Sequence, residues 1–282
     1  MRVLSAIAEV RAAVAGARRD GRRVALVPTM GALHEGHLSL VRRARVEAEL
    51  VVMSVFVNPL QFGPGEDLAR YPRDPEGDAA RARAAGVDVL FAPTPEELYP
   101  HPPRVTVAPA GLDARWEGAL RPGHFAGVLT VVLKLFHIVQ PDLAVFGQKD
   151  FQQAAIVRAM VEDLDLPLRL VVAPIVREPD GLAMSSRNRY LAEADRREAT
   201  RLSRALDAGR AAFAQGERDA GVLQSAARAV LEAAPAIAVD YLVVVNPATL
   251  EPVVQAADGD VILLAARVGG TRLLDNLVLG AP

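Results

Sequence analysis

The chain has 282 residues, with 32 lysines and arginines against 34 aspartates and glutamates, which gives a formal net charge of −2 at pH 7. This balance provides no electrostatic footprint for nucleic acid, so we expect no nucleic-acid partner. The lack of cysteine excludes a disulfide framework, a thiolate metal site and a cysteine nucleophile. No run of about 18 apolar residues occurs, so we expect no membrane partner. These features are typical of a cytoplasmic enzyme.

The N-terminal part predicts a helix, a strand and a second helix. Residues 1–11 carry charges within an apolar pattern, which predicts an amphipathic helix and not a signal peptide. The apolar run at 24–27 predicts a buried strand. Apolar residues at near-helical spacing over 38–44 predict a helix. The turn between this strand and helix lies where parallel α/β sheets bind ligands, at the carboxyl end of a strand.

That turn contains two glycines and two histidines. Gly31 and Gly36 let the backbone approach a bound group, and the free N–H groups of a helix start suit a phosphate. His34 and His37 are three residues apart, so on the first helical turn both can reach one anion. The alternative is a pair of surface histidines in a βα loop. A zinc-protease helix fits worse, because H-E-x-x-H places its histidines four apart.

The stretch from Pro28 to Val41, PTMGALHEGHLSLV, resembles the H-x-G-H signature of the nucleotidyltransferase superfamily. As a whole it is similar to the family of pantoate–β-alanine ligases, the pantothenate synthetases. Further similar segments lie between Val24 and Tyr190, and a weaker one covers 269–276. The resemblance implies ATP and Mg²⁺, pantoate and β-alanine as small-molecule substrates, and a homodimer. It also implies that the first loop contacts ATP through Met30, Gly31, His34, Gly36 and His37.

A second buried strand is predicted at 50–57, followed by Asn58 and Gln61. Both amides then lie on the carboxyl side of the sheet, as the histidines do. An amide both donates and accepts, which suits a substrate with hydroxyls and a carboxylate; a solvated loop glutamine is the alternative. The resemblance implies that Gln61 holds pantoate, with Asn58 and Met30 beside it. Residues 63–75 predict a mobile flap.

Asp78 has two possible roles. It falls in a helix predicted over 75–85, which a strand at 87–91 follows. The position matches a family acid associated with the magnesium ion. A second acid that many relatives carry beside it is Gly77 in this chain. An acid that stabilises the helix dipole is an equal alternative.

Three polar residues precede a long apolar helix predicted over 126–139. His124 is expected to be structural, as a cap of that helix. Glu117 and Arg121 resemble family residues at the mouth of the active site. A surface ion pair between them would have the same spacing.

A second strand–turn–helix unit repeats the arrangement of the first, with its strand at 143–146. Lys149 is one of only two lysines, with Lys134, so its retention indicates a task for a compact ammonium such as contact with phosphate oxygens. Asp150 either accepts from a ribose hydroxyl or caps the helix. The resemblance makes Gln153 the second pantoate glutamine. It assigns to ATP the four residues Gly147, Gln148, Lys149 and Asp150.

The segment Ser185-Ser186-Arg187 follows a glycine-led turn. Two hydroxyls and a guanidinium with bidentate geometry form a strong phosphate-binding set, although the bare pattern is common in loops. The segment resembles the family's counterpart of the loop that closes over the triphosphate in class I synthetases. The predicted ATP contacts in this region also include Val176 and Met184.

The order of predicted elements changes after residue 175. Strands and helices alternate before it, and helices over 193–234 then precede strands at 239–245 and 261–266. The fold class is therefore α/β: a Rossmann-like parallel sheet in an N-terminal domain, residues 1–175, with a smaller α+β domain at 176–282. A cleft between domains is a usual ligand site, and hinge closure would bring the Ser-Ser-Arg loop onto ATP.

With the resemblance to the pantoate–β-alanine ligases, these features predict an ATP-dependent, AMP-forming ligase; the resemblance implies that it condenses pantoate with β-alanine through a pantoyl adenylate. The catalytic groups would stabilise charge on phosphate oxygens, and His37 would also protonate one. Two alternatives remain: another H-x-G-H adenylyltransferase with a phosphorylated substrate, and a nucleotide-binding regulator without catalysis. A class I tRNA synthetase fits less well, because the chain is short and slightly acidic. The predicted catalytic residues are His34, His37, Lys149, Ser185, Ser186 and Arg187.

Overall fold

The computed structural model describes residues 1–281, which divide into two compact units. The first unit contains residues 1–147 and 156–173, and the second contains 148–155 and the chain from residue 174 onward. The expected domain boundary lay after residue 175. The short segment 148–155, which follows a strand of the first unit, groups with the second unit.

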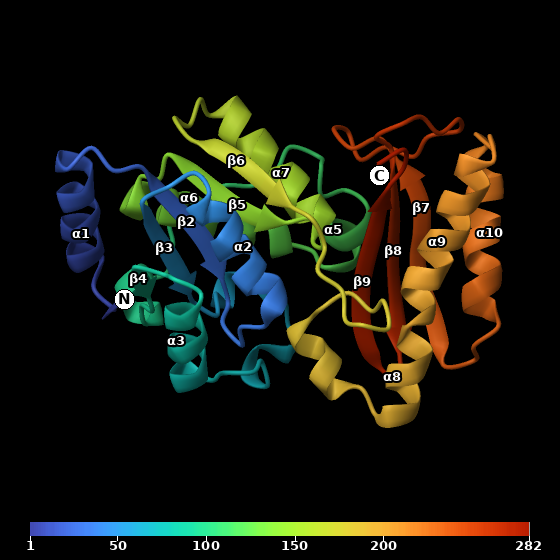
Figure 1. The fold of residues 1–282 in the computed structure, drawn as a ribbon, viewed down its shortest axis with the longest axis horizontal. Coiled ribbons are helices and arrows are strands. Elements are labelled where there is room, and N and C mark those ends of the chain that lie inside the picture. The colour runs from blue at the N-terminus through green and yellow to red at the C-terminus, as the bar shows by residue number, and fades with distance from the viewer. Residues whose placement is uncertain (282) are drawn as a thin grey trace. The chain divides into compact units, whose positions relative to one another are not determined.

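The first unit contains a parallel sheet of six strands (Figure 1). Their order is β1-β4-β3-β2-β5-β6, and every neighbouring pair is parallel. This confirms the expected Rossmann-like α/β part of the fold. The strands are β1 (Arg2–Leu4), β2 (Val24–Thr29), β3 (Leu50–Val55), β4 (Val89–Phe91), β5 (Leu143–Gly147) and β6 (Arg169–Ala173).

Helices connect these strands, as parallel strands require. They are α1 (Ile7–Arg19), α2 (Glu35–Arg45), α3 (Pro75–Ala84), α4 (Pro95–Leu98), α5 (Trp116–Leu120), α6 (His124–Val139) and α7 (Phe151–Asp163). The prediction of one helix from residue 1 was wrong at its start. Residues 2–4 form β1, which pairs with β4 at the edge of the sheet, and the helix begins at Ile7.

Both faces of the central strand β2 are buried. Ala25 and Val27 pack in a core with residues of α2 and α3. Val24 and Leu26 alternate with them, so they point to the opposite face, and all four are fully buried. On that face α1 and α6 contact β2 and each other. A continuous apolar strand is what two covered faces require.

The strand order places a topological switch point at β2 and β5. From β2 the chain proceeds to β3 and β4 in one direction, and β5 and β6 extend the sheet in the other. In open parallel sheets, ligands bind at such a switch point, outside the carboxyl ends of the strands. β2 ends at Thr29 and β5 at Gly147. Both glycine-containing turns predicted to bind ATP therefore start at the switch point of this sheet.

The second unit contains an antiparallel sheet of three strands in the order β7-β8-β9 and confirms the expected α+β part of the fold. The strands are β7 (Ile237–Val245), β8 (Val261–Val268) and β9 (Thr271–Val278), and the helices are α8 (Glu193–Ala199), α9 (Arg201–Ala214) and α10 (Ala220–Glu232). The sequence predicted β7 and β8 but not β9. Gly269 and Gly270, with φ of 53° and 83°, form the two-residue turn between β8 and β9.

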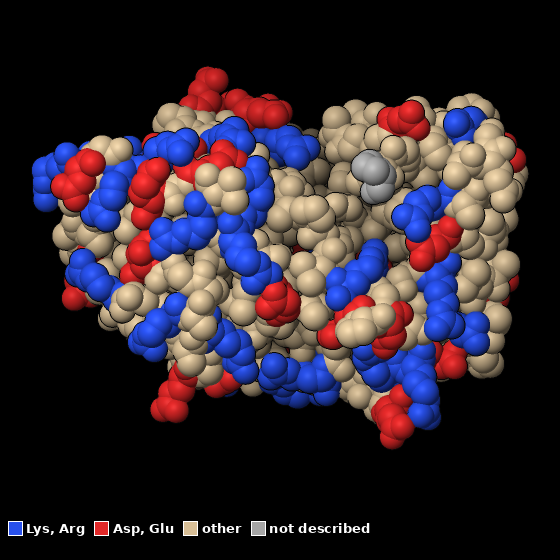
Figure 2. All heavy atoms as spheres, viewed as in Figure 1, with Lys and Arg blue, Asp and Glu red and all other residues tan. Residues whose placement is uncertain are grey.

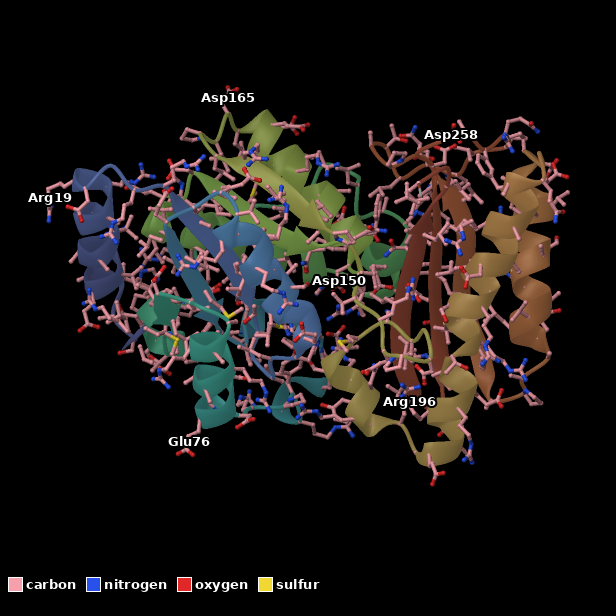
Figure 3. The ribbon with its side chains drawn as sticks, viewed as in Figure 1. Arg19, Glu76, Asp150, Asp165, Arg196 and Asp258 are labelled. Carbon is pink, nitrogen blue, oxygen red and sulfur yellow. The ribbon has the colours of Figure 1, made fainter. Side chains whose placement is uncertain are left out.

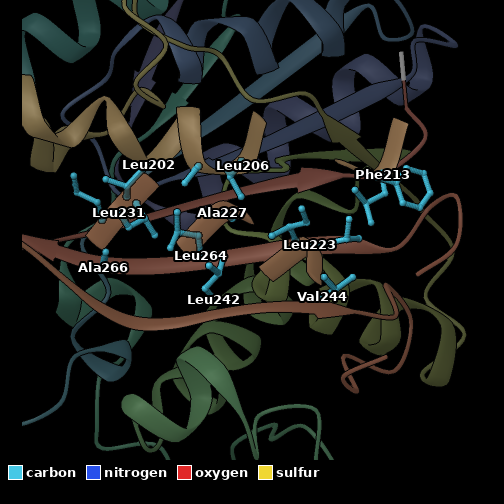
Figure 4. Close-up of a cluster of buried hydrophobic side chains, with 14 of the residues drawn as sticks. Leu202, Leu206, Phe213, Leu223, Ala227, Leu231, Leu242, Val244, Leu264 and Ala266 are labelled. Atoms are coloured by element: carbon cyan, nitrogen blue, oxygen red, sulfur yellow. The ribbon is translucent and has the colours of Figure 1, made fainter. Parts of the chain in front are cut away.

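Helices α9 and α10 pack against each other and against this sheet. Figure 4 shows the resulting core, in which leucines of the two helices meet apolar side chains of β7 and β8. Leu206, Leu223 and Leu264 are at most 1% exposed. Such a core gives the unit a rigid sheet from which polar side chains can be held in fixed positions.

Basic and acidic side chains are interspersed on the face shown in Figure 2, in keeping with the net charge of −2. Several arginines pair with carboxylates nearby in the sequence, for example Arg43 of α2 with Glu47 just beyond the end of this helix. Within residues 1–281, no helix is long and apolar enough to span a membrane.

Candidate active site

The predicted histidine pair lies at the N-terminus of α2. His34 is the N-cap residue, with φ −138° and ψ 176°, and its carbonyl accepts from the backbone N–H of His37 at 2.8 Å. The two imidazole ring centroids are 4.1 Å apart. Both side chains are half-buried. The structure therefore brings the two histidines together at a helix start, where backbone N–H groups and the helix dipole favour an anion.

The backbone contact of His37 fixes its tautomer. Nδ1 of His37 accepts from the backbone N–H of His34 at 3.3 Å. This is the reciprocal contact of a capping box, with an imidazole in place of the usual Glu or Gln. A neutral ring that accepts at Nδ1 carries its proton on Nε2. His37 thus presents an N–H donor at Nε2 while its other nitrogen stabilises the helix start.

Asp78 of α3 anchors the loop between β2 and α2. Its Oδ2 accepts from the backbone N–H of Ala32 at 2.8 Å and its Oδ1 from that of Leu33 at 2.7 Å, and the residue is only 2% exposed. A Cβ on Gly31 would lie 2.8 Å from Oδ2 of Asp78, so this close approach requires glycine. The Asp78 carboxylate, which we considered as a magnesium ligand, therefore holds the β2–α2 loop in place.

Three of the four predicted pantoate residues lie together in the first unit. Nδ2 of Asn58 donates to Oε1 of Gln61 at 3.2 Å, and Nε2 of Gln61 donates to Sδ of Met30 at 3.1 Å. Asn58 is held in turn by Gly127, whose carbonyl accepts from Nδ2 at 3.1 Å, and by the hydroxyl of Tyr99, which donates to Oδ1 at 3.0 Å. Burial raises the pKa of Tyr99 to about 12, so this hydroxyl remains a donor. The fourth residue, Gln153, belongs to the second unit.

The backbone of Gln61 is held by a polar network that the sequence did not reveal. Its carbonyl accepts from Nδ1 of His124 at 2.7 Å and from Arg121 at 3.3 Å. Arg121 also donates to Nε2 of His124 at 3.0 Å and forms a bidentate ion pair with Glu66 at 2.8 and 2.6 Å. A surface ion pair with Glu117 was the alternative role for Arg121, and the structure pairs Arg121 with the more distant Glu66. His124 is structural as expected, but Gly123 is the N-cap residue of α6.

We expect His124 to make stability depend on pH. Burial and the charge of Arg121 lower its pKa from 6.5 to about 4, while the Gln61 carbonyl, Glu66 and Glu117 act in the opposite direction. Between pH 6.5 and 4 the unfolded chain binds a proton at His124 that the folded chain does not. The contribution of His124 to the free energy of unfolding is therefore complete above pH 6.5 and is lost as the pH falls toward 4. The lost free energy of unfolding is about 3 kcal/mol. Chemical denaturation at pH 7, 5.5 and 4.5 measures it.

The variant His124→Asn removes this titration, so its free energy of unfolding should depend less on pH than that of the unmodified chain. His137 of the same helix is exposed, and His137→Asn serves as the matched control with an unchanged pH dependence. Parallel curves for the His124→Asn variant and the unmodified chain would contradict the assignment.

The turn after β5 carries three of the predicted ATP residues of the second unit, Gln148, Lys149 and Asp150. Gln148 and Lys149 form the turn, and the carbonyl of Asp150 accepts from Ala154 at 3.0 Å as α7 begins. Asp150 is exposed at this helix start (Figure 3). Its position fits both a helix cap and a group that contacts a ligand. Gln153 is half-buried in the first turn of the same helix.

The Ser-Ser-Arg segment continues a small hairpin. Met184 donates its backbone N–H to the carbonyl of Val176 at 3.0 Å, so these two predicted ATP contacts lie opposite each other. Ser185 then caps a short 3₁₀ helix, and its Oγ accepts from the backbone N–H of Arg187 at 3.2 Å. Ser186 is buried. The hydroxyls and the guanidinium thus follow one another on a tightly turned backbone.

Known proteins are similar to this chain over nearly its whole length. The family model for pantoate–β-alanine ligase matches residues 2–278. The chain belongs to the pantoate–β-alanine ligase family. A pantothenate synthetase of Rhizobium johnstonii is 53% identical over 281 residues, which cover 100% of this chain and 93% of the relative. The crystal structure of pantothenate synthetase from Thermus thermophilus has a TM-score of 0.94 at 51% identity and covers 99% of both chains.

A third relative is informative about ligands. The pantoate–β-alanine ligase of Francisella tularensis, described as a complex with beta-gamma ATP and β-alanine, has a TM-score of 0.81 at 30% identity. The match covers 100% of this chain and 99% of the chain of the Francisella tularensis ligase. Membership of the pantoate–β-alanine ligase family confirms the resemblance that the sequence indicated, and with it the prediction of an enzyme.

For a pantoate–β-alanine ligase, the structure places the predicted residues in two groups. The first unit holds Met30, Gly31, His34, Gly36, His37, Asn58, Gln61 and Gly147, and the second holds Gln148, Lys149, Asp150, Gln153, Val176, Met184, Ser185, Ser186 and Arg187. The residues that sequence reasoning missed are those that hold these groups in place, such as Glu66. Their partners are distant in sequence, so no local pattern marks them.

Proposed function

We propose that the chain condenses pantoate with β-alanine at the expense of ATP, through a pantoyl adenylate. The observation that carries this proposal is the match to the pantoate–β-alanine ligase family over residues 2–278. The Francisella tularensis relative, described as a complex with beta-gamma ATP and β-alanine, supports the choice of substrates. The contacts around Met30, Asn58 and Gln61 support a pocket for a small hydroxy acid.

In the first step a carboxylate oxygen of pantoate attacks the α-phosphorus of ATP. The bond from that phosphorus to the bridging oxygen breaks, and pyrophosphate leaves. Charge on the phosphate oxygens rises during this exchange, so preorganised donors lower the barrier. We assign that task to Nε2–H of His37 with His34 beside it, and to Lys149, Ser185, Ser186 and Arg187.

In the second step the neutral amine of β-alanine attacks the acyl carbon of the adenylate. The bond from this carbon to the AMP oxygen breaks, AMP leaves with the electron pair, and the nitrogen loses a proton. Gln61 and Gln153 hold the hydroxyls and carbonyl of the pantoyl group, and Met30 packs against its methyl groups. Positioning by these side chains supplies the main part of the rate enhancement in this step.

Magnesium enters this proposal only as a partner of the ATP phosphates, with which it commonly binds. Both oxygens of Asp78 already accept loop amides, so this residue does not fit an open metal ligand. Within the described residues, no group of three His, Cys, Asp or Glu side chains suits a metal ion. We also propose a homodimer, which sedimentation of the purified chain would test.

Pyrophosphate release tests the reaction. With ATP, Mg²⁺ and pantoate alone, we expect release limited to about one equivalent per site, because the adenylate remains bound. Addition of β-alanine should make release catalytic. If only a phosphorylated acceptor elicits release, the adenylyltransferase chemistry stands and pantoate is the wrong substrate. ATP binding without turnover with any acceptor would favour a regulator.

Gly127→Ala should weaken pantoate binding. A Cβ at this position of α6 would lie 2.2 Å from the carbonyl oxygen of Leu60 and 2.7 Å from Cα of Gln61, so the loop that carries Gln61 must move. We expect KM for pantoate to rise about tenfold, with a stability loss of about 1–3 kcal/mol from overpacking. Steady-state kinetics and thermal unfolding measure the two effects.

The same change at Gly16 is the matched control. Gly16 also lies within a helix, but a Cβ there has only the end of the Arg19 side chain nearby, at 3.9 Å. Gly16→Ala should leave KM for pantoate unchanged and stabilise the chain by about 0.5–1 kcal/mol. An unchanged KM in Gly127→Ala would remove Gln61 from the proposed pocket.

A further inference from the structure

The segment 269–276 resembles the family, but the sequence assigned it no role. Its last two residues, Asp275 and Asn276, lie within β9. They are 3% and 2% exposed, although both are polar. Buried polar side chains require partners. The partners of this pair lie in the two segments of the second unit that carry predicted ATP residues.

Asn276 uses its whole side chain on the turn after β5. Its Oδ1 accepts from Nε2 of Gln148 at 3.1 Å. Its Nδ2 donates to the backbone carbonyls of Gln148 at 2.9 Å and of Lys149 at 3.0 Å. Both amide protons are therefore used on consecutive carbonyls, which fixes the backbone of the turn from which the Lys149 side chain extends.

Asp275 holds the other segment. Its carboxylate forms a bidentate ion pair with Arg177, at 2.7 and 3.0 Å. Arg177 pairs with Ala183 across the hairpin and donates to the carbonyl of Gly181 at 3.0 Å. This hairpin leads directly into Ser185. Bidentate pairs restrict geometry more strongly than single hydrogen bonds do, so Asp275 fixes the start of the Ser-Ser-Arg segment.

Neighbouring residues of a strand point to opposite faces of its sheet. Asp275 shares its face with Leu273, a residue of the core formed with α9 and α10, and Asn276 faces the other way. Asp275 thus holds the Arg177 hairpin from one face of β9, and Asn276 holds the Lys149 turn from the other. Because β9 is paired with β8 along its whole length, neither side chain can shift without the sheet.

We propose that Asp275 and Asn276 are positioning residues, which hold the Lys149 turn and the Ser-Ser-Arg hairpin of the second unit in the arrangement that binds the ATP phosphates. The inference rests on the proposed function, because it takes Lys149 as an ATP contact. It adds two residues that touch no reacting atom and act through the groups they hold.

Asn276→Ala tests the proposal through ATP affinity, measured by calorimetry on the full chain. We expect the dissociation constant of ATP to rise about tenfold, because the turn loses three hydrogen bonds. The matched control is Asn246→Ala. Asn246 also uses its side chain on a turn of this unit, where it accepts from Ala248 and Thr249 at 3.0 and 3.1 Å, but that turn carries no predicted ligand group. The control should lose stability without a change in ATP affinity.

A double-mutant cycle with Lys149→Ala separates positioning from general destabilisation. If Asn276 acts through Lys149, the variant lacking both should bind ATP as weakly as Lys149→Ala alone, within about twofold. Asn276→Ser, which keeps one donor, should give an intermediate dissociation constant and serves as a test if the alanine variant does not fold.

Two results would overturn the inference while the proposed function stands. One is an Asn276→Ala variant that binds ATP as the unmodified chain does while Lys149→Ala binds it weakly. The other is a rise in the dissociation constant of ATP on Asn276→Ala that is as large in the Lys149→Ala background as in the unmodified chain. Unchanged ATP affinity in Lys149→Ala would instead remove Lys149 from the site, and the positioning role with it. Failure of pyrophosphate release in the unmodified chain would count against the proposed reaction alone.

Discussion

Replacement of His37 by alanine is expected to lower kcat/KM for pyrophosphate release about 10²–10³-fold. The loss follows from removal of the Nε2–H donor that the contact of Nδ1 with the His34 backbone fixes. The same variant loses the acceptor of the capping contact, which should cost about 1 kcal/mol of stability. Pyrophosphate release and urea unfolding of the same preparation measure both effects.

His37→Gln separates the two roles. A glutamine at this helix position can accept from the His34 backbone, so stability should return while activity stays at least about tenfold low. Arg42→Ala is the matched control on α2, because this exposed side chain pairs with Glu35 of the same helix. A His37→Gln variant with full activity would show that the imidazole has no specific role.

Asp78→Ala should have the largest effect on stability. The carboxylate accepts two backbone N–H groups of the β2–α2 loop, and both would remain buried without an acceptor. Each unsatisfied group costs about 1–3 kcal/mol, so we expect a loss of about 3 kcal/mol in the free energy of unfolding. The loop carries Met30 and Gly31, so activity should fall with it. Urea unfolding in the presence and absence of Mg²⁺ measures the stability.

Asp74→Ala is the control within the same helix. Asp74 is the N-cap residue of α3 and accepts from Gly77 at 3.0 Å, so its loss should cost about 1 kcal/mol. A metal role for Asp78 predicts a different pattern, in which the variant unfolds as the unmodified chain does but requires more Mg²⁺ for activity. That result would contradict the anchoring role.

Local patterns in the sequence determined most of the first unit. The apolar run at 24–27 and the helical spacing after it identified β2, α2 and the turn between them, because buried parallel strands and amphipathic helices have distinct periods. Two short or interrupted strands were missed. β1 has only three residues, and in β9 the polar residues Thr271 and Arg272 and the polar pair Asp275–Asn276 leave only two short apolar pairs.

By itself the sequence predicted which residues face the ligands, since glycines, histidines and amides beside strand ends and helix starts have a recognisable spacing. The tertiary structure decided what holds them. The contacts of Asn276 with Gln148, of Arg121 with Glu66 and of Asp78 with Ala32 join residues 128, 55 and 46 positions apart. Such hydrogen bonds form only when tertiary folding brings distant segments together. The periodicity of a single segment therefore cannot predict them.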